Sequence, residues 1–170
     1  MVARLVATAE AMELLRRLRG IHGALMMHQS GGCCDGSSPM CYPDGEFIVG
    51  DRDVLLGIID LRLDVGEVPT DLPVGADGMP VWISGSQFEA WKHTQLVLDA
   101  VPGRGSGFSL ETPEGKRFLS RARAFTKSEN DALAAMPPLL GADWDEGSRP
   151  PHADEPQVVA EAADACPVPR

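Results

Sequence analysis

The chain has 170 residues and a mass of 18.2 kDa, which is enough for one domain with a sizeable hydrophobic core. Its hydrophobic fraction of 44% and charged fraction of 24% are ordinary for a globular protein, and its net charge of −10 argues against binding to a nucleic-acid backbone. No stretch approaches the roughly 18 consecutive apolar residues of a membrane helix, and the N-terminus lacks the apolar core of a signal peptide. We therefore expect a cytoplasmic protein with reduced thiols.

The sequence predicts an N-terminal helix over residues 8–19. Thr8 is a suitable N-cap, apolar residues recur at helical spacing over residues 11–18, and Gly20 is placed to end the helix. A short apolar run over residues 24–27 then predicts a strand that leads into a polar loop.

From residue 45 to 125 the sequence predicts mostly strands, because short apolar segments alternate with glycine, proline and aspartate. The expected strands cover residues 46–49, 54–63, 79–83, 95–101 and 108–111. Residues 84–91 predict one short helix, and residues 128–136 predict another. Between two expected strands, the glycine-rich segment 103–108 superficially suggests a phosphate loop, but it lacks the Lys-Ser/Thr ending and predicts a tight turn instead.

The last thirty residues differ in composition from the rest of the chain. Residues 141–170 contain seven acids, five prolines and two arginines, which favours a disordered acidic tail. The predicted architecture is therefore α+β, with an N-terminal helix packed against mainly antiparallel sheets. We expect a domain over residues 5–126, a short accessory helical segment over 127–140, and the tail from 141 onward.

The chemistry of this chain is concentrated in the segment HQSGGCCDGSSPMC, residues 28–41. It holds one of four histidines, His28, and three of four cysteines: Cys33, Cys34 and Cys41. Thiolates and imidazoles bind iron, zinc or copper and hold iron–sulfur clusters. The surrounding glycines and serines predict a flexible polar loop, which is a poor place to bury a side chain. The segment therefore predicts a metal site, with His93 as a second candidate nitrogen ligand.

Other interpretations of these residues stay open. Cysteines often behave as small buried hydrophobes. Cys33 and Cys34 could instead form a strained disulfide that acts as a redox switch, although no adjacent lysine or arginine favours their thiolates. His28 could simply end a strand and bond to a carbonyl, and His93 could be an ordinary surface histidine.

Three segments resemble a bacterial family known as domain of unknown function 779. They are residues 28–41, the string WKHTQ at 91–95, and GRGSGFSLE at 103–111, and the resemblance covers about residues 8–126. Members of that family are often encoded beside aldehyde dehydrogenases, so the resemblance implies such an enzyme as a partner.

The order of features also resembles the HesB/IscA group of A-type iron–sulfur carriers. The helix opening with Thr8, the Gly-Gly-Cys string at 31–33, and the Gly-x-Gly-Phe string at 105–108 match that group. The group's final cysteine pair is missing, because SRARAF at 120–125 stands in its place, so only Cys33 carries over as a ligand. This resemblance implies a HesB-like fold and a homo-oligomer.

Together these features predict a small metal- or iron–sulfur-binding accessory protein of an aldehyde dehydrogenase system, rather than an enzyme. Its ligands would be Cys33, Cys34 and Cys41, with His28 or His93. One alternative is a metal-free binding module that modulates or stabilises the dehydrogenase. The other is a thiol redox protein that acts through Cys33.

Overall fold

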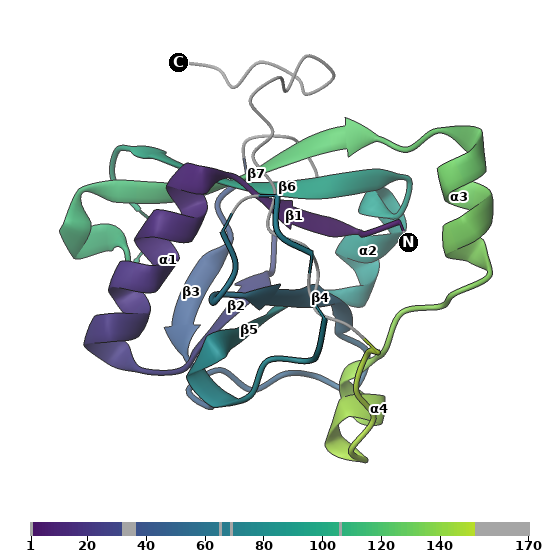
Figure 1. Cartoon of the computed structure of the whole chain (residues 1–170), viewed down its shortest axis with the longest axis horizontal. Helices are drawn as coiled ribbons and strands as arrows, with labels where there is room; N and C mark the ends of the chain where they lie inside the picture. Colours follow the sequence, from purple (N-terminus) through teal and green to yellow (C-terminus); the bar gives the residue numbers. More distant parts are fainter. Residues whose placement is uncertain (1, 32–36, 65, 69, 106, 152–170) are drawn as a thin grey trace.

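The computed structural model describes residues 2–31, 37–64, 66–68, 70–105 and 107–151, and it has the predicted α+β fold (Figure 1). Its elements in chain order are β1 (Leu5–Ala7), α1 (Ala9–His22), β2 (Leu25–Gln29), β3 (Met40–Pro43), β4 (Val54–Asp60), η1 (Gly75–Asp77), β5 (Gly78–Ile83), α2 (Gly85–Trp91), β6 (Thr94–Pro102), η2 (Thr112–Glu114), β7 (Lys116–Ala124), α3 (Lys127–Ala134) and α4 (Gly141–Asp145).

Helix α1 begins as predicted and ends later than predicted. The side-chain oxygen of Thr8 accepts a hydrogen bond from the backbone N–H of Ala11 at 3.2 Å, so Thr8 is the N-cap. The prediction that Gly20 ends the helix is wrong, because Gly20 lies inside α1. The helix ends at Gly23, whose φ of +79° is a left-handed value that glycine adopts without strain.

The strands of the described residues form two sheets. The three-stranded sheet has the order β1-β6-β7, in which β1 runs parallel and β7 antiparallel to β6. The four-stranded sheet has the order β3-β2-β5-β4, in which β2 and β5 are parallel and the other two pairs are antiparallel. Helix α1 lies along one side of the molecule, whereas α3 and α4 lie at its other end (Figure 1).

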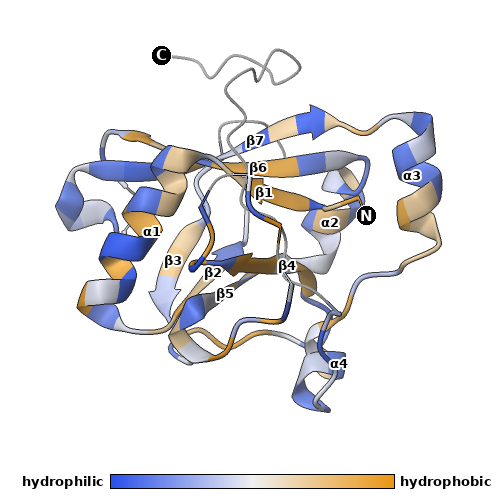
Figure 2. Ribbon diagram, viewed as in Figure 1, coloured by the Kyte–Doolittle hydropathy of each residue, from blue (hydrophilic) through white to orange (hydrophobic). Residues whose placement is uncertain are grey.

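The four-stranded sheet is covered on both faces, because successive side chains of a strand point to opposite faces. On the inner face, Met27 and Cys41 pack with residues of α1 and of the three-stranded sheet. On the outer face, Met26 and Trp82 pack with Phe47 and other residues outside the strands. Colouring by hydropathy shows β4 as largely hydrophobic and α1 as striped with hydrophilic and hydrophobic residues (Figure 2).

Two of the predicted strands are wrong, and two short strands were not predicted. Residues 46–49 belong to the connection between β3 and β4, and residues 108–111 belong to the connection between β6 and β7. That second connection, from residue 103 to 115, is also longer than the predicted tight turn. The short strands β1 and β3 fall outside the segments in which the sequence predicted strands.

Residues 141–145, which we expected to begin a disordered tail, form helix α4 instead. The backbone N–H of its first residue donates to the carbonyl of Asp53 at 2.8 Å. The ring of Trp144 meets the ring of Trp82 edge-on, with 5.6 Å between the ring centroids. Helix α4 therefore helps to cover the outer face of the four-stranded sheet. The rest of the predicted tail, residues 152–170, lies outside the described residues.

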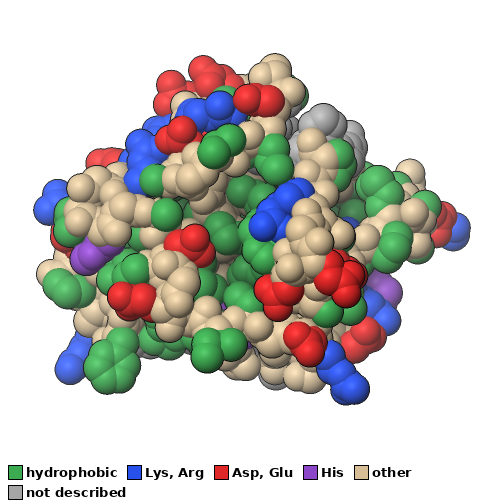
Figure 3. All heavy atoms as spheres, turned by 90° about the horizontal axis from the view of Figure 1, so that it is seen from below, with side chains coloured by type: hydrophobic (Ala, Val, Ile, Leu, Met, Phe, Trp, Pro, Cys, Tyr) green, Lys and Arg blue, Asp and Glu red, His purple; other side chains and the backbone are tan. Residues whose placement is uncertain are grey.

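The surface mixes charged and apolar side chains. On the face seen from below, apolar side chains in the middle are bordered by acidic side chains and by several lysines and arginines (Figure 3). The large apolar residues Phe108 and Ile48 are 92% and 90% exposed, and they belong to different connections. Single exposed apolar residues are usual on globular proteins and do not by themselves mark an interface.

Candidate functional site

The predicted cysteine loop leaves the four-stranded sheet at the carboxyl end of β2. Cys33 and Cys34 lie outside the described residues, but both ends of their loop are described. At the first end, the side-chain oxygen of Gln29 accepts a hydrogen bond from Ser120 Oγ at 2.8 Å. At the second end, the carbonyl of Ser37 accepts the backbone N–H of Ser120 at 2.7 Å. One fully buried residue of β7 therefore holds both ends of the loop.

His28 lies on β2 directly before this loop, and its side chain is 4% exposed. Its Nδ1 lies 2.6 Å from Oγ of Ser30, and its Nε2 lies 2.9 Å from Oδ2 of Asp53. The same carboxylate oxygen accepts the backbone N–H of Gly50 at 2.9 Å. Because a carboxylate only accepts hydrogen bonds, Nε2 must carry the hydrogen of the neutral ring. In that neutral form Nδ1 is an acceptor, to which the hydroxyl of Ser30 can donate.

The sheet topology brings Asp53 to His28. Strand β5 lies between β2 and β4, parallel to β2 and antiparallel to β4. The carboxyl end of β2 and the residues that precede β4 therefore meet at the same edge of the sheet. Phe47 covers the imidazole from the loop between β3 and β4, with 4.5 Å between ring centroids. The ring of His28 is thus fixed in position by one ring contact and by partners at both nitrogens.

The sequence pattern indicates His28 as a site residue but does not indicate its two side-chain partners, Ser30 and Asp53. Ser30 lies two residues after His28 along an extended segment, so the period of two that places residues on one face could have indicated it. Asp53 comes from a separate connection, and its approach to His28 depends on strand order, which no local pattern in the sequence reveals.

Cys41 lies on the other face of the sheet from His28. It pairs with Met27 across the antiparallel strands β2 and β3, whereas His28 pairs with Met40. Paired residues point to the same face and successive residues to opposite faces, so the side chain of Cys41 enters the inner core. Cys41 is fully buried, and burial, together with the charge of Glu111, raises the pKa of its thiol. The structure therefore does not bring Cys41 together with His28.

A buried carboxyl lies near Cys41 instead. The backbone N–H of Cys41 donates to Oγ of Ser109 at 2.9 Å, and that hydroxyl donates to Oε2 of Glu111. Glu111 is fully buried, and this burial raises the pKa of its carboxyl, although the hydrogen bond from Ser109 acts in the opposite direction. Its other oxygen, Oε1, is buried and has no hydrogen-bond partner among the described residues. Both effects on Cys41, its burial and the nearby Glu111, favour the thiol over the thiolate.

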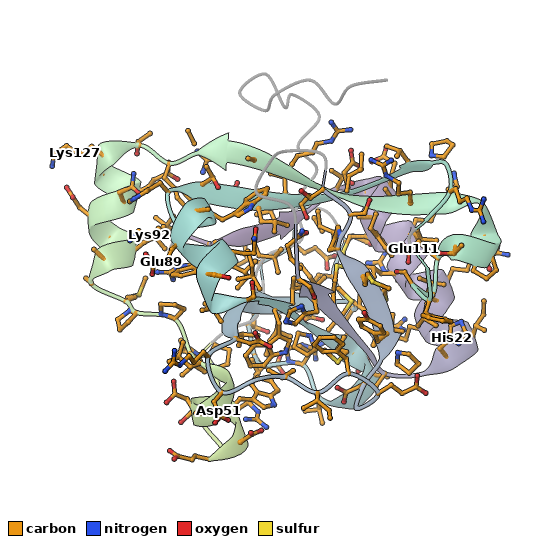
Figure 4. All side chains as sticks on the ribbon, turned by 180° about the vertical axis from the view of Figure 1, so that it is seen from behind. His22, Asp51, Glu89, Lys92, Glu111 and Lys127 are labelled. Atoms are coloured by element: carbon orange, nitrogen blue, oxygen red, sulfur yellow. The ribbon has the colours of Figure 1, made fainter. Side chains whose placement is uncertain are left out.

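His93 belongs to a different region. It lies in the exposed turn between α2 and β6, and its Nδ1 is 3.3 Å from the side-chain oxygen of Asn130 in α3. Its neighbour Lys92 lies at the opposite end of the molecule from Glu111, the residue beside Cys41 (Figure 4). Of the predicted ligands that the structure describes, His28, Cys41 and His93 thus occupy three separate environments.

The described residues offer one oriented imidazole rather than a complete metal shell. Within these ranges, no three His, Cys, Asp or Glu side chains lie close enough together to hold a metal ion. A histidine whose second nitrogen donates to a carboxylate is nevertheless the usual arrangement of a metal ligand, because the carboxylate fixes the tautomer and raises the basicity of the other nitrogen. His28 and Asp53 have this arrangement.

None of the helices in the described part of the chain is long and apolar enough to cross a membrane. No curated protein and no solved structure matches the chain, so the similarity to the HesB group stays a prediction. A family model matches residues 14–124, which is well over half of the chain and includes every candidate ligand. As the motifs predicted, the chain belongs to the family described as a domain of unknown function, DUF779.

Proposed function

We propose that this protein is a small metal-binding accessory protein whose ligands are Nδ1 of His28 and the thiolates of Cys33 and Cys34. The observation that supports this proposal is the hydrogen bond of 2.9 Å between His28 Nε2 and Asp53 Oδ2. It leaves Nδ1 as the lone-pair nitrogen, and Nδ1 is bonded to Ser30, the residue that directly precedes the glycine pair of the cysteine loop.

This ligand set differs from the one that the sequence predicted. Cys41 is left out because its side chain lies in the inner core, on the opposite sheet face from His28. His93 is left out because it bonds to α3. One imidazole and two thiolates suit zinc, copper or iron, and three protein ligands leave a position open for a substrate or for a group from a partner.

The bonding of both described ends of the loop to one residue supports the same proposal. Gln29 and Ser37 frame the loop, and both are held by Ser120. A loop whose ends are fixed loses less conformational freedom when a metal gathers its ligands than a free segment would. The two described ends of the segment that contains Cys33 and Cys34 are therefore both bonded to the same residue.

The partner that we propose is an aldehyde dehydrogenase. The support for this partner is the family membership, since relatives of this chain are often encoded beside such enzymes. In this role the protein would bind metal on behalf of the dehydrogenase system, and it would not catalyse a reaction of its own.

Elemental analysis of anaerobically purified protein tests the metal site. We expect near-stoichiometric metal in the natural protein and its loss in the Cys33→Ser, Cys34→Ser double variant and in His28→Ala. Cys41→Ala is the matched control and should keep its metal, because it removes a thiol from the same segment of the sequence but from the opposite face of the sheet. Metal-free natural protein, grown with iron, zinc and copper available, would overturn the proposal.

A further inference from the structure

Ser30, His28 and Asp53 form a continuous chain of hydrogen bonds at the carboxyl end of β2. Oγ of Ser30 lies 2.6 Å from Nδ1 of His28, and Nε2 of the same ring lies 2.9 Å from Oδ2 of Asp53. A hydroxyl, an imidazole and a carboxylate in this order, each within about 2.6–3.2 Å of the next, are the arrangement that activates a serine for attack on a carbonyl carbon. All three residues belong to the described part of the chain.

We infer that Ser30 is an activated nucleophile that accepts an acyl group from activated esters, a class that includes aryl esters and thioesters. The reaction is separate from the proposed metal binding and does not depend on it. A serine hydroxyl attacks poorly unless a base takes its proton, and Nδ1 of His28 is the base within reach. In the neutral ring the hydrogen on Nε2 faces Asp53, so Nδ1 presents its lone pair to the hydroxyl.

Asp53 favours the proton transfer from Ser30. The transfer makes the ring of His28 a positive imidazolium, which the nearby carboxylate stabilises. The side chains of His28 and Asp53 are only 4% and 15% exposed, so water screens their attraction weakly. The backbone N–H of Gly50 donates to the same carboxylate oxygen at 2.9 Å and holds it toward the ring. In many serine hydrolases the two ring nitrogens have the opposite roles, but either nitrogen can take the proton while the other donates to the carboxylate.

The nucleophile is accessible, whereas its base is protected. Ser30 is exposed, and a Cβ on the next residue, Gly31, would meet no described atom within 4 Å. The imidazole of His28 lies under Phe47, with 4.5 Å between the ring centroids. An ester can therefore reach Oγ, while water reaches Nδ1 poorly. Because the reaction takes place at the surface, water stabilises the negative charge on the carbonyl oxygen, which suits activated esters rather than amides.

The step balances without any further reactant. Oγ of Ser30 forms a bond to the carbonyl carbon while its proton passes to Nδ1 of His28. The bond from that carbon to the leaving oxygen or sulfur then breaks, and the leaving group takes the proton from Nδ1. The products are an acylated serine and a free alcohol or thiol, and nothing is oxidised or reduced.

An alkyl fluorophosphonate tests this assignment, because it reacts with activated serines to give a stable adduct. Oγ replaces fluoride on phosphorus, and the serine proton leaves through His28. We expect Ser30 to be labelled about 100-fold faster than Ser86, an exposed serine of α2, as general-base catalysis would provide. Mass spectrometry of the digested protein gives both rates in one experiment. A chelator is present throughout, since a metal on Nδ1 would break the bond to Ser30.

Matched variants separate activation from mere exposure. Asp53→Asn should slow the labelling of Ser30 about 10- to 100-fold, whereas Asp51→Asn, which changes an exposed carboxylate two residues away, should not. Release of p-nitrophenolate from p-nitrophenyl acetate should fall in Ser30→Ala and stay unchanged in Ser86→Ala. Circular dichroism verifies that each variant is folded.

The rates decide the role of each residue. Equal labelling of Ser30 and Ser86 in the natural protein would overturn the assignment. Fast labelling of Ser30 that is unchanged in Asp53→Asn would overturn the three-residue arrangement. Fast labelling that falls in Asp53→Asn, together with slower ester cleavage in Ser30→Ala, supports it. These results do not depend on whether the protein binds metal, so the proposed function is tested separately.

Discussion

His28 and Cys41 lie on neighbouring strands, one position out of register, yet their side chains leave the sheet on opposite faces. Met27 and Cys41 face the core that includes α1, whereas His28 faces Phe47 on the other side. The pleat of an antiparallel pair fixes this separation, because moving one side chain to the other face would need a shift of the strand by one residue. Two residues that look like members of one ligand cluster in the sequence therefore belong to different layers of the protein.

Cys41 should matter for stability and not for metal content. We expect Cys41→Ala to lower the free energy of unfolding by about 1–2 kcal/mol, because it leaves a small cavity in the core. Cys41→Ser should cost more than Cys41→Ala, since it places a hydroxyl in the fully buried position of the thiol. Urea unfolding in the presence of a chelator gives the stability order, and a more stable serine variant would contradict it.

Glu111 should make stability depend on pH. Burial raises the pKa of its carboxyl above the ordinary value of 4.5, so the folded protein holds this proton more tightly than the unfolded chain. The contribution of Glu111 to the free energy of unfolding is therefore fully present below about pH 4.5, and it is lost as the pH rises through the higher pKa of the folded state. Glutamine does not titrate, so we expect Glu111→Gln to lack this pH-dependent loss of stability.

The measurement is the difference in free energy of unfolding between the natural protein and Glu111→Gln, followed by urea unfolding from pH 4 to pH 8. The difference should shift in favour of the glutamine variant as the pH rises. Taking a difference cancels the titration of the other acids, such as Glu129, whose pKa is held at about 2 by Arg123. A difference that stays constant with pH would show that Glu111 titrates normally.

Gly105 should be intolerant of a side chain. A Cβ at this position would lie 2.6 Å from Oγ1 of Thr112 and 3.1 Å from Oε1 of Glu111, both of which are buried atoms. We expect Gly105→Ala to lower the free energy of unfolding by about 1–3 kcal/mol. The matched control is Gly20→Ala inside α1, where a Cβ meets nothing within 4 Å and where alanine should instead stabilise the helix by about 0.5–1 kcal/mol. Equal effects of the two substitutions on the thermal midpoint would refute this contrast.

Asp53 should control metal affinity without contacting the metal. In Asp53→Asn the imidazole of His28 loses its charged partner, so the tautomer and the orientation of the ring are less strongly fixed. We expect Zn²⁺ affinity to fall about 10- to 100-fold. Asp51→Asn removes an exposed carboxylate two residues away and should leave the affinity unchanged. Equal affinities of the two variants, measured by chelator competition, would exclude a positioning role for Asp53.

Much of the fold could be predicted from local patterns. The cap at Thr8 and the apolar stripe of α1 gave the helix start, and apolar runs gave β2, β4, β5 and β6. Strand β3 was missed because it is a short edge strand that ends in Pro43, and proline at an edge gives no strand signal. The apolar residues at 46–49 predict a strand, but Phe47 and Val49 pack over the four-stranded sheet rather than within it.

The candidate site was predictable in its chemistry and not in its geometry. The concentration of cysteines and one histidine in residues 28–41 is enough to predict a site there. The pairing of His28 with Asp53 required knowledge that β5 lies between β2 and β4. The exclusion of Cys41 required the register of β2 against β3. Both depend on long-range pairing, which local sequence patterns do not encode.

Ser120 joins the cysteine loop to the three-stranded sheet, since its side chain bonds to Gln29 and its backbone bonds to Ser37. The loop follows β2 of the four-stranded sheet, but both of its described ends are bonded to a residue of the three-stranded sheet. A movement of β7 away from β2 would therefore break the bonds at both described ends of the loop, while the hydrogen bonds within each sheet could stay intact.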